Sequence, residues 1–487
     1  MKKTELESYF EHFRKNIVGI NSTFKTPFGS KKIIYTDWIA SGRLYYPIEN
    51  KITNELGPFI GNPHTDSNMS SSFTTEMYNE ARNVIKNHVK ANENDILIAA
   101  GYGMTAAINK LQRILGIRVN NYHYFSPNFK LDEKPVVFIT QMEHHSNQIS
   151  WLTTIADVVL IDFDKNFEID YGDLERKLDL YKNKKLKIGS FTAASNVTGI
   201  KTDVHRLAEI MHAYGGYCFV DYAAAAPYVE INMHPEKEEQ RLDAIFFSPH
   251  KFLGGPGANG ILIMSKKLYK NIIPDNPGGG TVTWTNPWGG YKFFENIELR
   301  EDGGTPGFIQ MIKAALAIKL KEEMGVENIN KRESEIINYL FDNMSEIEGI
   351  NILGPKKLDR LGVISFNIDG MHYNLATKLL NDKYGIQVRG GCACAGTYGH
   401  LLFNIGRKIS KQITSKIDKH DLSEKPGFVR LSVHPTTTTE EVETIIDALK
   451  DLTQNRENYK ALYVYDKNKN EFYHKDFKFN YTSLFEN

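Results

Sequence analysis

The stretch FFSPHKFLGGPGANGILIM, from Phe246 to Met264, places a lysine in a short turn between two apolar runs. Lys251 follows the small polar residues Ser248 and His250 and precedes a glycine-rich segment. Lysines are seldom buried without a partner, and a desolvated lysine amine can serve as a Schiff-base nucleophile. A solvated turn lysine is the ordinary alternative. The surrounding sequence has to decide between these two interpretations.

Short apolar runs alternate with helical patterns from about residue 95 to residue 265. The runs that predict strands are DILIAA, PVVFIT, DVVLIDF, KIGSFTAA, YCFVDY, DAIFFS and GILIMS. Apolar strands separated by helices predict a mostly parallel α/β sheet that binds its ligand at the carboxyl ends of the strands. Longer helices follow after about residue 310. We therefore expect an N-terminal segment over 1–36, a large α/β domain over 37–310, and a smaller α+β domain over 311–487 with a hairpin-like C-terminal extension.

The composition narrows the class of protein. The chain has 487 residues, with 59 Lys and Arg against 59 Asp and Glu, so nothing indicates nucleic acid or an anionic membrane as a partner. Its cysteines, Cys218, Cys392 and Cys394, are too few for a disulfide framework. The N-terminus lacks the apolar region of a signal peptide, and no stretch approaches the ~18 apolar residues of a membrane span. These features predict a soluble, cytoplasmic protein.

Polar residues follow several of the predicted strands. LIAAGYGMTAAINKL begins a helix near Thr105, and a helix start favours phosphate. VFITQMEHHSNQISW places His144 and His145 just past a strand, where an imidazole can stack on a planar ligand. YCFVDYAAAAP ends a strand at Asp221, whose carboxylate needs a cationic partner such as a protonated ring nitrogen. Together with Lys251, these residues describe a pyridoxal 5′-phosphate (PLP) site.

The order of the motifs along the chain strengthens this interpretation. YTDWIASGR, EHHSN, SNVTG, SPHK, REDGGTPG and VRLSVHPTTTTEE resemble the motifs of class V aminotransferase-like enzymes, in the cysteine desulfurase and selenocysteine lyase branch. The resemblance covers most of the chain. It implies PLP fold type I, with a large domain built on a mostly parallel sheet, and a homodimer.

The resemblance also implies a role for each matching position. Lys251 would form the Schiff base with PLP and move the substrate α-proton, Asp221 would pair with the pyridinium nitrogen, and His144 would stack on the ring. The other implied roles are phosphate binding by Thr105, Ser248 and His250, phosphate binding across the dimer by Thr305, contact with the cofactor oxygen or the substrate carboxylate by Asn196, and carboxylate binding by Arg430. One position departs from the family: desulfurases usually have D-x-x-Q after this strand, and Ala224 stands where the glutamine is expected.

The segment QVRGGCACAGTYGH bears on the reaction class. Arg389, Gly391 and Cys394 satisfy the R-x-G-x-x-C pattern of desulfurases, and the C-x-C form also resembles molybdenum cofactor sulfurases. The resemblance implies that the Cys394 thiolate attacks the substrate sulfur, leaving a persulfide and alanine. Spacing alone does not choose between Cys392 and Cys394. Two alternatives stay open, a zinc site with His400 as third ligand and a purely structural role for both cysteines.

We therefore expect a homodimeric, PLP-dependent cysteine desulfurase-like enzyme that acts on cysteine or a similar amino acid and passes sulfur to an acceptor protein. A second interpretation is a class V aminotransferase or another PLP-dependent lyase in which Cys394 is not catalytic. A third is a catalytically silent scaffold. The intact Lys251 and Asp221 argue against the third.

Overall fold

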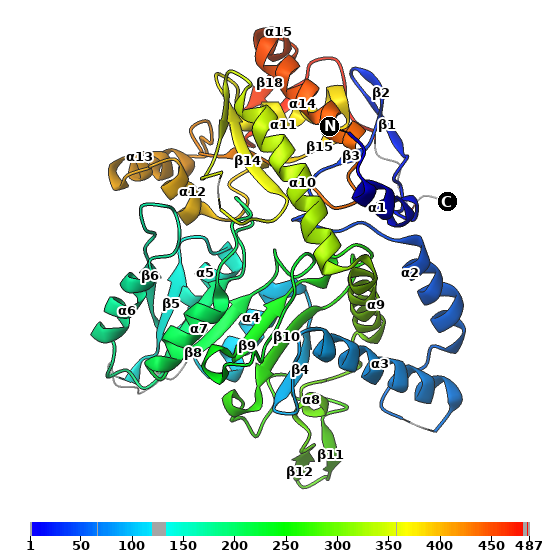
Figure 1. The fold of residues 1–487 in the computed structure, drawn as a ribbon. Coiled ribbons are helices and arrows are strands. Elements are labelled where there is room, and N and C mark those ends of the chain that lie inside the picture. Colours follow the sequence, from blue (N-terminus) through cyan, green and yellow to red (C-terminus); the bar gives the residue numbers. More distant parts are fainter. Residues whose placement is uncertain (1, 66, 119–132, 357, 481–484, 486–487) are drawn as a thin grey trace. The chain divides into compact units, whose positions relative to one another are not determined.

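The computed structural model describes residues 2–65, 67–118, 133–356, 358–480 and 485, which form two compact units (Figure 1). The large unit comprises residues 40–195 and 200–327. The small unit comprises residues 1–39, 196–199 and 328–487.

The large unit is built on a seven-stranded sheet that contains every strand expected from the apolar runs. Its order is β4 (Asp95–Ala100), β10 (Gly260–Ser265), β9 (Ala244–Phe247), β8 (Tyr217–Asp221), β7 (Lys187–Thr192), β5 (Val136–Thr140) and β6 (Asp157–Ile161). Only β10 runs antiparallel to its neighbours. The other six strands therefore end at the same edge of the sheet, which confirms the expected mostly parallel α/β fold.

Helices cover both faces of this sheet (Figure 1). On one face, α4 (Gly103–Ile114) and α5 (His145–Leu152) pack their apolar residues, such as Ile108 and Trp151, against β4, β5, β8, β9 and β10. On the other face lies α7 (Val204–Ala213), which begins at the expected cap Asp203 and brings Met211 close to Gly189 of β7. The remaining elements of this unit are α2 (Tyr46–Asn50), α3 (Met69–His88), α6 (Tyr171–Leu180), β11 (Val282–Thr285), β12 (Tyr291–Phe293), α8 (Ile297–Arg300) and α9 (Phe308–Met324).

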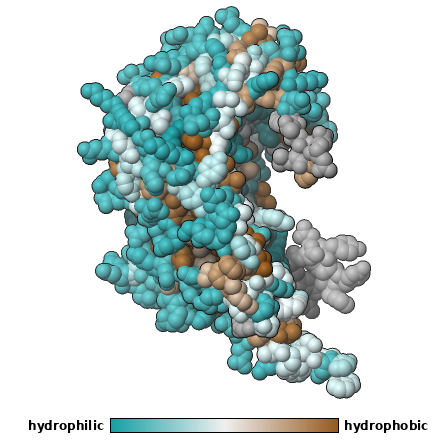
Figure 2. Space-filling model, turned by 90° about the vertical axis from the view of Figure 1, so that its right-hand side faces the viewer, coloured by the Kyte–Doolittle hydropathy of each residue, from teal (hydrophilic) through white to brown (hydrophobic). Residues whose placement is uncertain are grey.

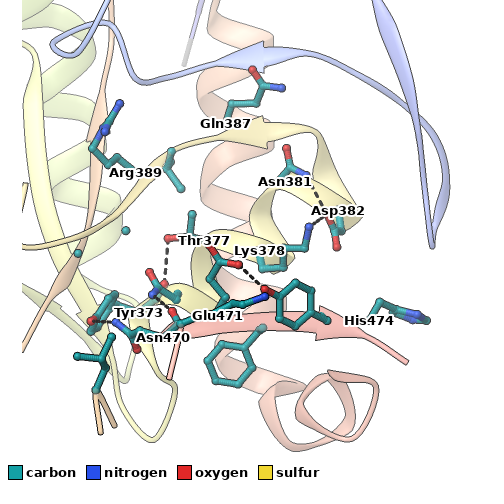
Figure 3. Close-up of a pocket in the computed structure, with 18 of the residues that line it drawn as sticks. Tyr373, Thr377, Lys378, Asn381, Asp382, Gln387, Arg389, Asn470, Glu471 and His474 are labelled. Atoms are coloured by element: carbon teal, nitrogen blue, oxygen red, sulfur yellow. Dashed lines mark hydrogen bonds and ion pairs between the residues drawn. The ribbon is translucent and has the colours of Figure 1, made fainter. Parts of the chain in front are cut away.

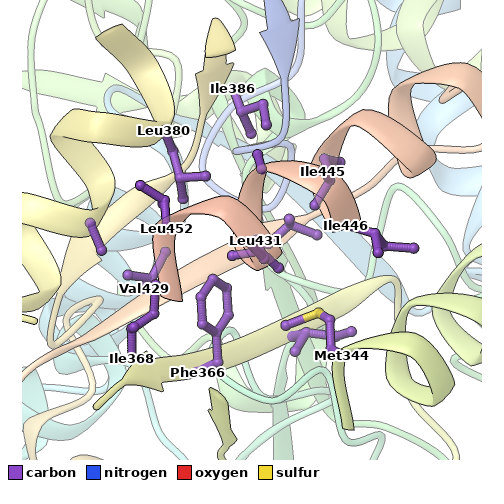
Figure 4. Packing of buried hydrophobic residues seen from close by; sticks show 14 of the residues in the cluster. Met344, Phe366, Ile368, Leu380, Ile386, Val429, Leu431, Ile445, Ile446 and Leu452 are labelled. Carbon is purple, nitrogen blue, oxygen red and sulfur yellow. The ribbon is translucent and has the colours of Figure 1, made fainter. Parts of the chain in front are cut away.

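The small unit contains a four-stranded antiparallel sheet in the order β13 (Ile350–Ile352), β14 (Val363–Ile368), β17 (Phe428–Ser432) and β16 (Arg389–Gly391). One face carries alternate apolar residues of β14 and β17, which pack against α10 (Val326–Ser345), α11 (Tyr373–Tyr384) and α14 (Thr439–Gln454) (Figure 4). Helix α14 begins with the expected capping box of Thr438 and Glu441. The other elements are α1 (Glu5–Lys15), β1 (Thr23–Thr26), β2 (Gly29–Lys32), β3 (Ile34–Tyr35), β15 (Ile386–Gln387), α12 (Gly396–Leu402), α13 (Arg407–Ile417), α15 (Arg456–Lys460), β18 (Tyr463–Asp466) and β19 (Glu471–His474).

The two units divide the chain differently from the expected boundaries at 36/37 and 310/311. The N-terminal residues belong to the small unit because β3 pairs with β15 and Asp37 forms a bridge with Ser432. The later boundary lies at residue 327 because α9 packs along α3 within the large unit. Residues 196–199 also join the small unit, where Ser365 donates a hydrogen bond to the carbonyl of Val197.

The face of the protein drawn in Figure 2 is mostly hydrophilic. Among the residues that the structure describes, no helix has the length and apolar character needed to cross a membrane.

Candidate active site

Lys251 lies directly after the end of β9. The strand ends at Phe247, Ser248 follows, and Pro249–Lys251 form a single turn of 3-10 helix. The Lys251 amide donates to the Ser248 carbonyl at 3.0 Å, which fixes the turn, and the lysine is partly buried. The sequence expectation of a partly desolvated lysine in a tight turn is therefore confirmed.

The start of α4 gathers the residues expected to bind phosphate. Gly103 has a positive φ of 60°, and a Cβ at this position would lie 2.8 Å from Oγ of Ser248 and 3.6 Å from Cδ2 of His250. Ser248 Oγ accepts a hydrogen bond from the amide of Met104 at 2.8 Å. Thr105 is exposed in the first turn of the helix, with its Oγ1 2.6 Å from Oγ of Ser146. A helix start with hydroxyl groups around it favours an anion such as phosphate.

Asp221 ends β8 as a buried carboxylate with 2% of its surface exposed. Burial raises the pKa of Asp221 to about 6, although a hydrogen bond from the Ala223 amide at 2.8 Å and the positive charge of Lys251 act in the opposite direction. A carboxylate held out of water in this way gains from a cationic partner. Ala224, which stands at the place of the family glutamine three residues later, is also buried.

His144 is the N-cap of α5, and its Nδ1 accepts a hydrogen bond from the amide of Ser146 at 3.1 Å. This bond fixes the ring orientation at the carboxyl end of β5. The following residue, His145, is also partly buried. Burial lowers the pKa of His250 to about 4, helped by the charge of Lys251, so His250 is neutral at pH 7.

Glu143 belongs to this region, although the sequence analysis did not select it. It is fully buried and accepts hydrogen bonds from Oγ1 of Thr140 at 2.7 Å, Nδ2 of Asn147 at 2.7 Å and the Thr192 amide at 3.1 Å. Burial raises the pKa of Glu143 to about 7, against the effect of these hydrogen bonds. The available signal resembled that of Asp221: a carboxylate close to the end of a buried strand, three residues after the last residue of β5.

Thr305 lies in the exposed loop between α8 and α9, after the close approach of Gly303 to the carbonyl of Asn276. Its expected role across a dimer is a prediction that the single chain does not test.

The predicted carboxylate-binding residue, Arg430, lies in β17 of the small unit. It is directly opposite Arg389 of β16, and side chains opposite one another in an antiparallel pair share a face. Two facing arginines would repel, but Asp37 separates them: its Oδ1 accepts from Nη2 of Arg430 at 2.8 Å and its Oδ2 from Nη2 of Arg389 at 2.8 Å. Sequence reasoning quoted the motif around Asp37 but did not assign this residue a role.

Arg430 also contacts the segment that contains Asn196. Its Nη1 donates to the Asn196 carbonyl at 3.1 Å, while Nε is buried and has no hydrogen-bond partner among the described residues. Burial lowers the pKa of Arg430, and the charge of Asp37 acts in the opposite direction. Asn196 keeps a buried Oδ1 that likewise has no partner in the described part of the chain. Arg430 therefore keeps one unused donor, and Asn196 keeps one unused acceptor.

The two neighbouring cysteines occupy a tight turn. The amide of Ala395 donates to the carbonyl of Cys392 at 3.0 Å, and the intervening residues Ala393 and Cys394 have positive φ values of 47° and 55°. Positive φ is costly for residues other than glycine, by about 1–2 kcal/mol each. Nδ2 of Asn196 donates to the carbonyl of Ala393 at 2.7 Å and helps to hold the turn.

The cysteines differ in exposure. Cys394 is exposed, Cys392 is partly buried, and Cys218 is buried in β8. Burial raises the pKa of Cys218 well above its usual value, which keeps this thiol unreactive, as the sequence predicted. In the alternative zinc site, His400 would be the third ligand, but its ring nitrogens lie 2.8 Å from the Gly396 carbonyl and 3.0 Å from Oγ of Ser410.

The donor set of the large unit fits PLP. Asp221 is a buried carboxylate that would gain from a protonated ring nitrogen, and the glycine start of α4 would bind a phosphate next to Thr105 and Ser248. Lys251, the only one of these residues able to form a Schiff base, lies one residue after His250 in the same turn.

Comparison with known proteins identifies the family to which the chain belongs. The family model of the class-V aminotransferases matches residues 34–445, and the chain belongs to this family. Enzymes of this family are PLP-dependent, and PLP is accordingly the cofactor of this protein.

Relatives with similar sequences or structures are named as cysteine desulfurases or probable cysteine desulfurases. The chain is 30% identical to a probable cysteine desulfurase of Halalkalibacterium halodurans over 368 residues, which cover 74% of this chain and 84% of the relative. A probable cysteine desulfurase of Staphylococcus aureus is 30% identical over 370 residues, or 75% and 84% of the two chains. The apo structure of a cysteine desulfurase from Thermococcus onnurineus has a TM-score of 0.72 and 24% identity, covering 93% of this chain and 99% of that one. This last likeness confirms the fold.

Proposed function

We propose that this protein is a cysteine desulfurase that releases sulfur from L-cysteine, leaves it as a persulfide on Cys394 and forms alanine. The observation that carries the proposal is the exposed Cys394 thiol in a tight turn next to Arg389, in the R-x-G-x-x-C register. Cys394 interacts electrostatically with both Arg389 and Arg430. The attacking form of a cysteine is its thiolate. The names of the curated relatives support the same reaction.

The residues of the large unit have complementary roles in this proposal. When bound, PLP supplies an electron-withdrawing ring that stabilises negative charge on the substrate Cα. Lys251 holds the cofactor and moves the proton at Cα, and Asp221 provides the negative charge for the ring nitrogen. His144 stacks on the ring, while Thr105, Ser248 and the neutral His250 bind the phosphate.

Substrate binding is assigned to the small unit. Arg430 binds the substrate carboxylate with the donors that Asp37 and the Asn196 carbonyl leave available, of which Nε is one. Asn196 supplies Oδ1 as an acceptor for the substrate or the cofactor. An Arg–carboxylate pair that excludes water fixes the substrate in one orientation.

The experiment that tests the reaction measures alanine and sulfide after incubation of the PLP-bound enzyme with L-cysteine and a reductant. Equal amounts of both products are expected. Cys394→Ala should abolish the persulfide while the cofactor spectrum is unchanged, and Cys392→Ala should retain at least part of the activity. Alkylation followed by mass spectrometry locates the persulfide. Full activity in Cys394→Ala, or amino-group transfer without sulfide, would instead support an aminotransferase or another lyase.

The assembly and location of the protein are part of the proposal. We infer a homodimer in which Thr305 of one chain helps to bind the phosphate in the other, a cytoplasmic location, and an acceptor protein for the sulfur. The exposed loop around Thr305 and the exposed thiol of Cys394, which needs a reducing compartment, support these inferences. Sedimentation measures whether the protein is a dimer, and a fully active monomer would contradict the proposed assembly. Thr305→Ala should lose PLP more readily than the wild type.

A further inference from the structure

A large cavity lies beside the two cysteines, entirely within the small unit. It has a volume of about 1050 Å³, and its lining includes Cys392 and Cys394. Helix α11 lies between β16 and β19, and side chains from all three elements surround the cavity (Figure 3). Gly390 allows β16 to lie against α11, because a Cβ there would be 2.5 Å from Oδ1 of Asn374. The turn that holds the reactive thiol is therefore one wall of a built site.

The opposite wall belongs to the C-terminal extension, to which the sequence assigned no chemistry. The carbonyl of Asn470 accepts a hydrogen bond from Asn374 of α11, and its Nδ2 donates to the hydroxyl of Tyr373 at 2.7 Å. Phe472 of β19 lies 5.4 Å from the ring of His372. These contacts fasten the extension to α11. The match to the family model ends at residue 445, before the residues of this wall.

The lining is cationic although the whole chain is neutral. It contains the five cations Lys378, Arg389, Lys425, Lys469 and Lys478, and the two carboxylates Asp382 and Glu471. Arg389 shares the carboxylate of Asp37 with Arg430, and Lys378 lies 3.5 Å from Asp382. The other three lysines form no ion pair with the residues that the structure describes. Glu471 is the one remaining carboxylate of the lining, and it accepts a hydrogen bond from Tyr473. The cavity thus has an excess of positive charge next to the thiol.

Two further features indicate a peptide and not a small molecule. The volume of about 1050 Å³ lies just above the ~300–1,000 Å³ range of small-molecule sites. β16 is an edge strand of its four-stranded sheet, and β19 is an edge strand of its two-stranded sheet. Edge strands are the elements to which extended peptides add, and apolar side chains such as Phe477 and Phe479 offer contacts between the charges.

We propose that this cavity binds an extended, acidic, cysteine-bearing segment of the sulfur-acceptor protein. The inference rests on the proposed desulfurase function. In the transfer step, the acceptor thiolate attacks the outer sulfur of the Cys394 persulfide. The S–S bond to Cys394 breaks, a new S–S bond forms on the acceptor, and Cys394 leaves as a thiolate that takes up the acceptor's proton. Sulfur, electrons and protons balance without a further reactant.

Binding is tested separately from the reaction. The probe is a short fluorescein-labelled peptide in which Glu alternates with Leu and Ser replaces the cysteine, added to the PLP-bound full-length protein and followed by fluorescence anisotropy. The test variant is Lys469→Glu combined with Lys478→Glu, since both side chains are exposed and line the cavity. The matched control is Lys467→Glu combined with Lys475→Glu, because these lysines are exposed on the same extension outside the lining.

The test variant should weaken binding of the peptide about ten-fold, since two attractive charges become repulsive, and the control should bind like the wild type. Added salt should weaken binding to the wild type. A peptide with Lys in place of each Glu should not bind. The proposal would be overturned if the test and control variants bound the peptide equally or if the wild type did not bind it. Displacement of the peptide by glutathione at equal concentration would also overturn it. The binding assay needs no turnover. If the protein produces alanine and sulfide but does not bind the peptide, this inference alone is refuted. If it produces neither alanine nor sulfide, the proposed function is refuted.

Discussion

The buried carboxylate of Asp221 makes the stability of the cofactor-free protein depend on pH in a specific direction. Its pKa rises from 3.8 to about 6 on folding because of burial. Between these two values the folded state binds more protons than the unfolded state, so stability falls as the pH rises through the window. A difference of about two pKa units corresponds to about 3 kcal/mol. Above pH 6 the free energy of unfolding is reduced by this full amount, and below pH 4 it is not reduced.

Asp221→Asn removes this titration. An unsatisfied amide group would change the stability of the variant by the same amount at every pH, so the comparison of slopes is unaffected. Urea unfolding of cofactor-free wild type and variant at several pH values between 4 and 7.5 measures the difference. The wild type should lose about 3 kcal/mol more than Asp221→Asn across this range. Burial is the main cause that raises the pKa of Glu143 to about 7, and this cause is present in both proteins; the charge of Asp221 raises the pKa of Glu143 further in the wild type alone.

The exposed Asp476→Asn is the control and should follow the wild type. With PLP bound, Asp221→Asn should retain the cofactor but remove the substrate α-proton more slowly, because the charge that favours a protonated ring nitrogen is lost. Parallel pH profiles for Asp221→Asn and wild type would show that Asp221 is ionised throughout, and the argument from burial would then be refuted.

Three further changes probe the two units. Lys251→Ala should lose the visible absorbance that borohydride removes; a variant with the same reducible chromophore would show that another residue holds PLP. Asp37→Asn leaves the buried Arg430 without its carboxylate, so denaturant unfolding should show a loss of about 3 kcal/mol, and an unchanged midpoint would contradict the ion-pair assignment. Asn196→Ala removes the donor to the strained turn, so alkylation of Cys394 should become faster at equal cofactor content; an unchanged rate would show that the turn holds itself.

The sequence was sufficient for the features that depend on local order. Short, mostly apolar runs of six to eight residues predicted all seven strands of the large sheet, because a strand buried on both faces is mostly apolar. The parallel arrangement then placed Asp221, His144, Thr105 and Lys251 at one edge, since the carboxyl ends of parallel strands coincide. The position of a polar residue just after such a strand was the signal in each case.

Glu143 follows the same predicted strand as His144 and His145, and its carboxyl group gave a similar signal. The hydrogen bond that Glu143 accepts from the Thr192 amide depends on β7 lying beside β5. Strand order is a tertiary property, because sequence periodicity says which face of a strand is buried but not which strand is its neighbour.

What the sequence by itself determined is the set of candidate reactive groups: a lysine in a turn between buried strands, a carboxylate at a strand end, and a cysteine in a glycine-containing loop. Only the tertiary structure decided what surrounds them. Asp37 meets Arg430 across 393 positions of sequence because β17 pairs with β16 and bridges to the N-terminal strand. The C-terminal hairpin lies beside the cysteines because Asn470 bonds to α11. Such contacts depend on register and packing between distant segments, and no local pattern of residues encodes them.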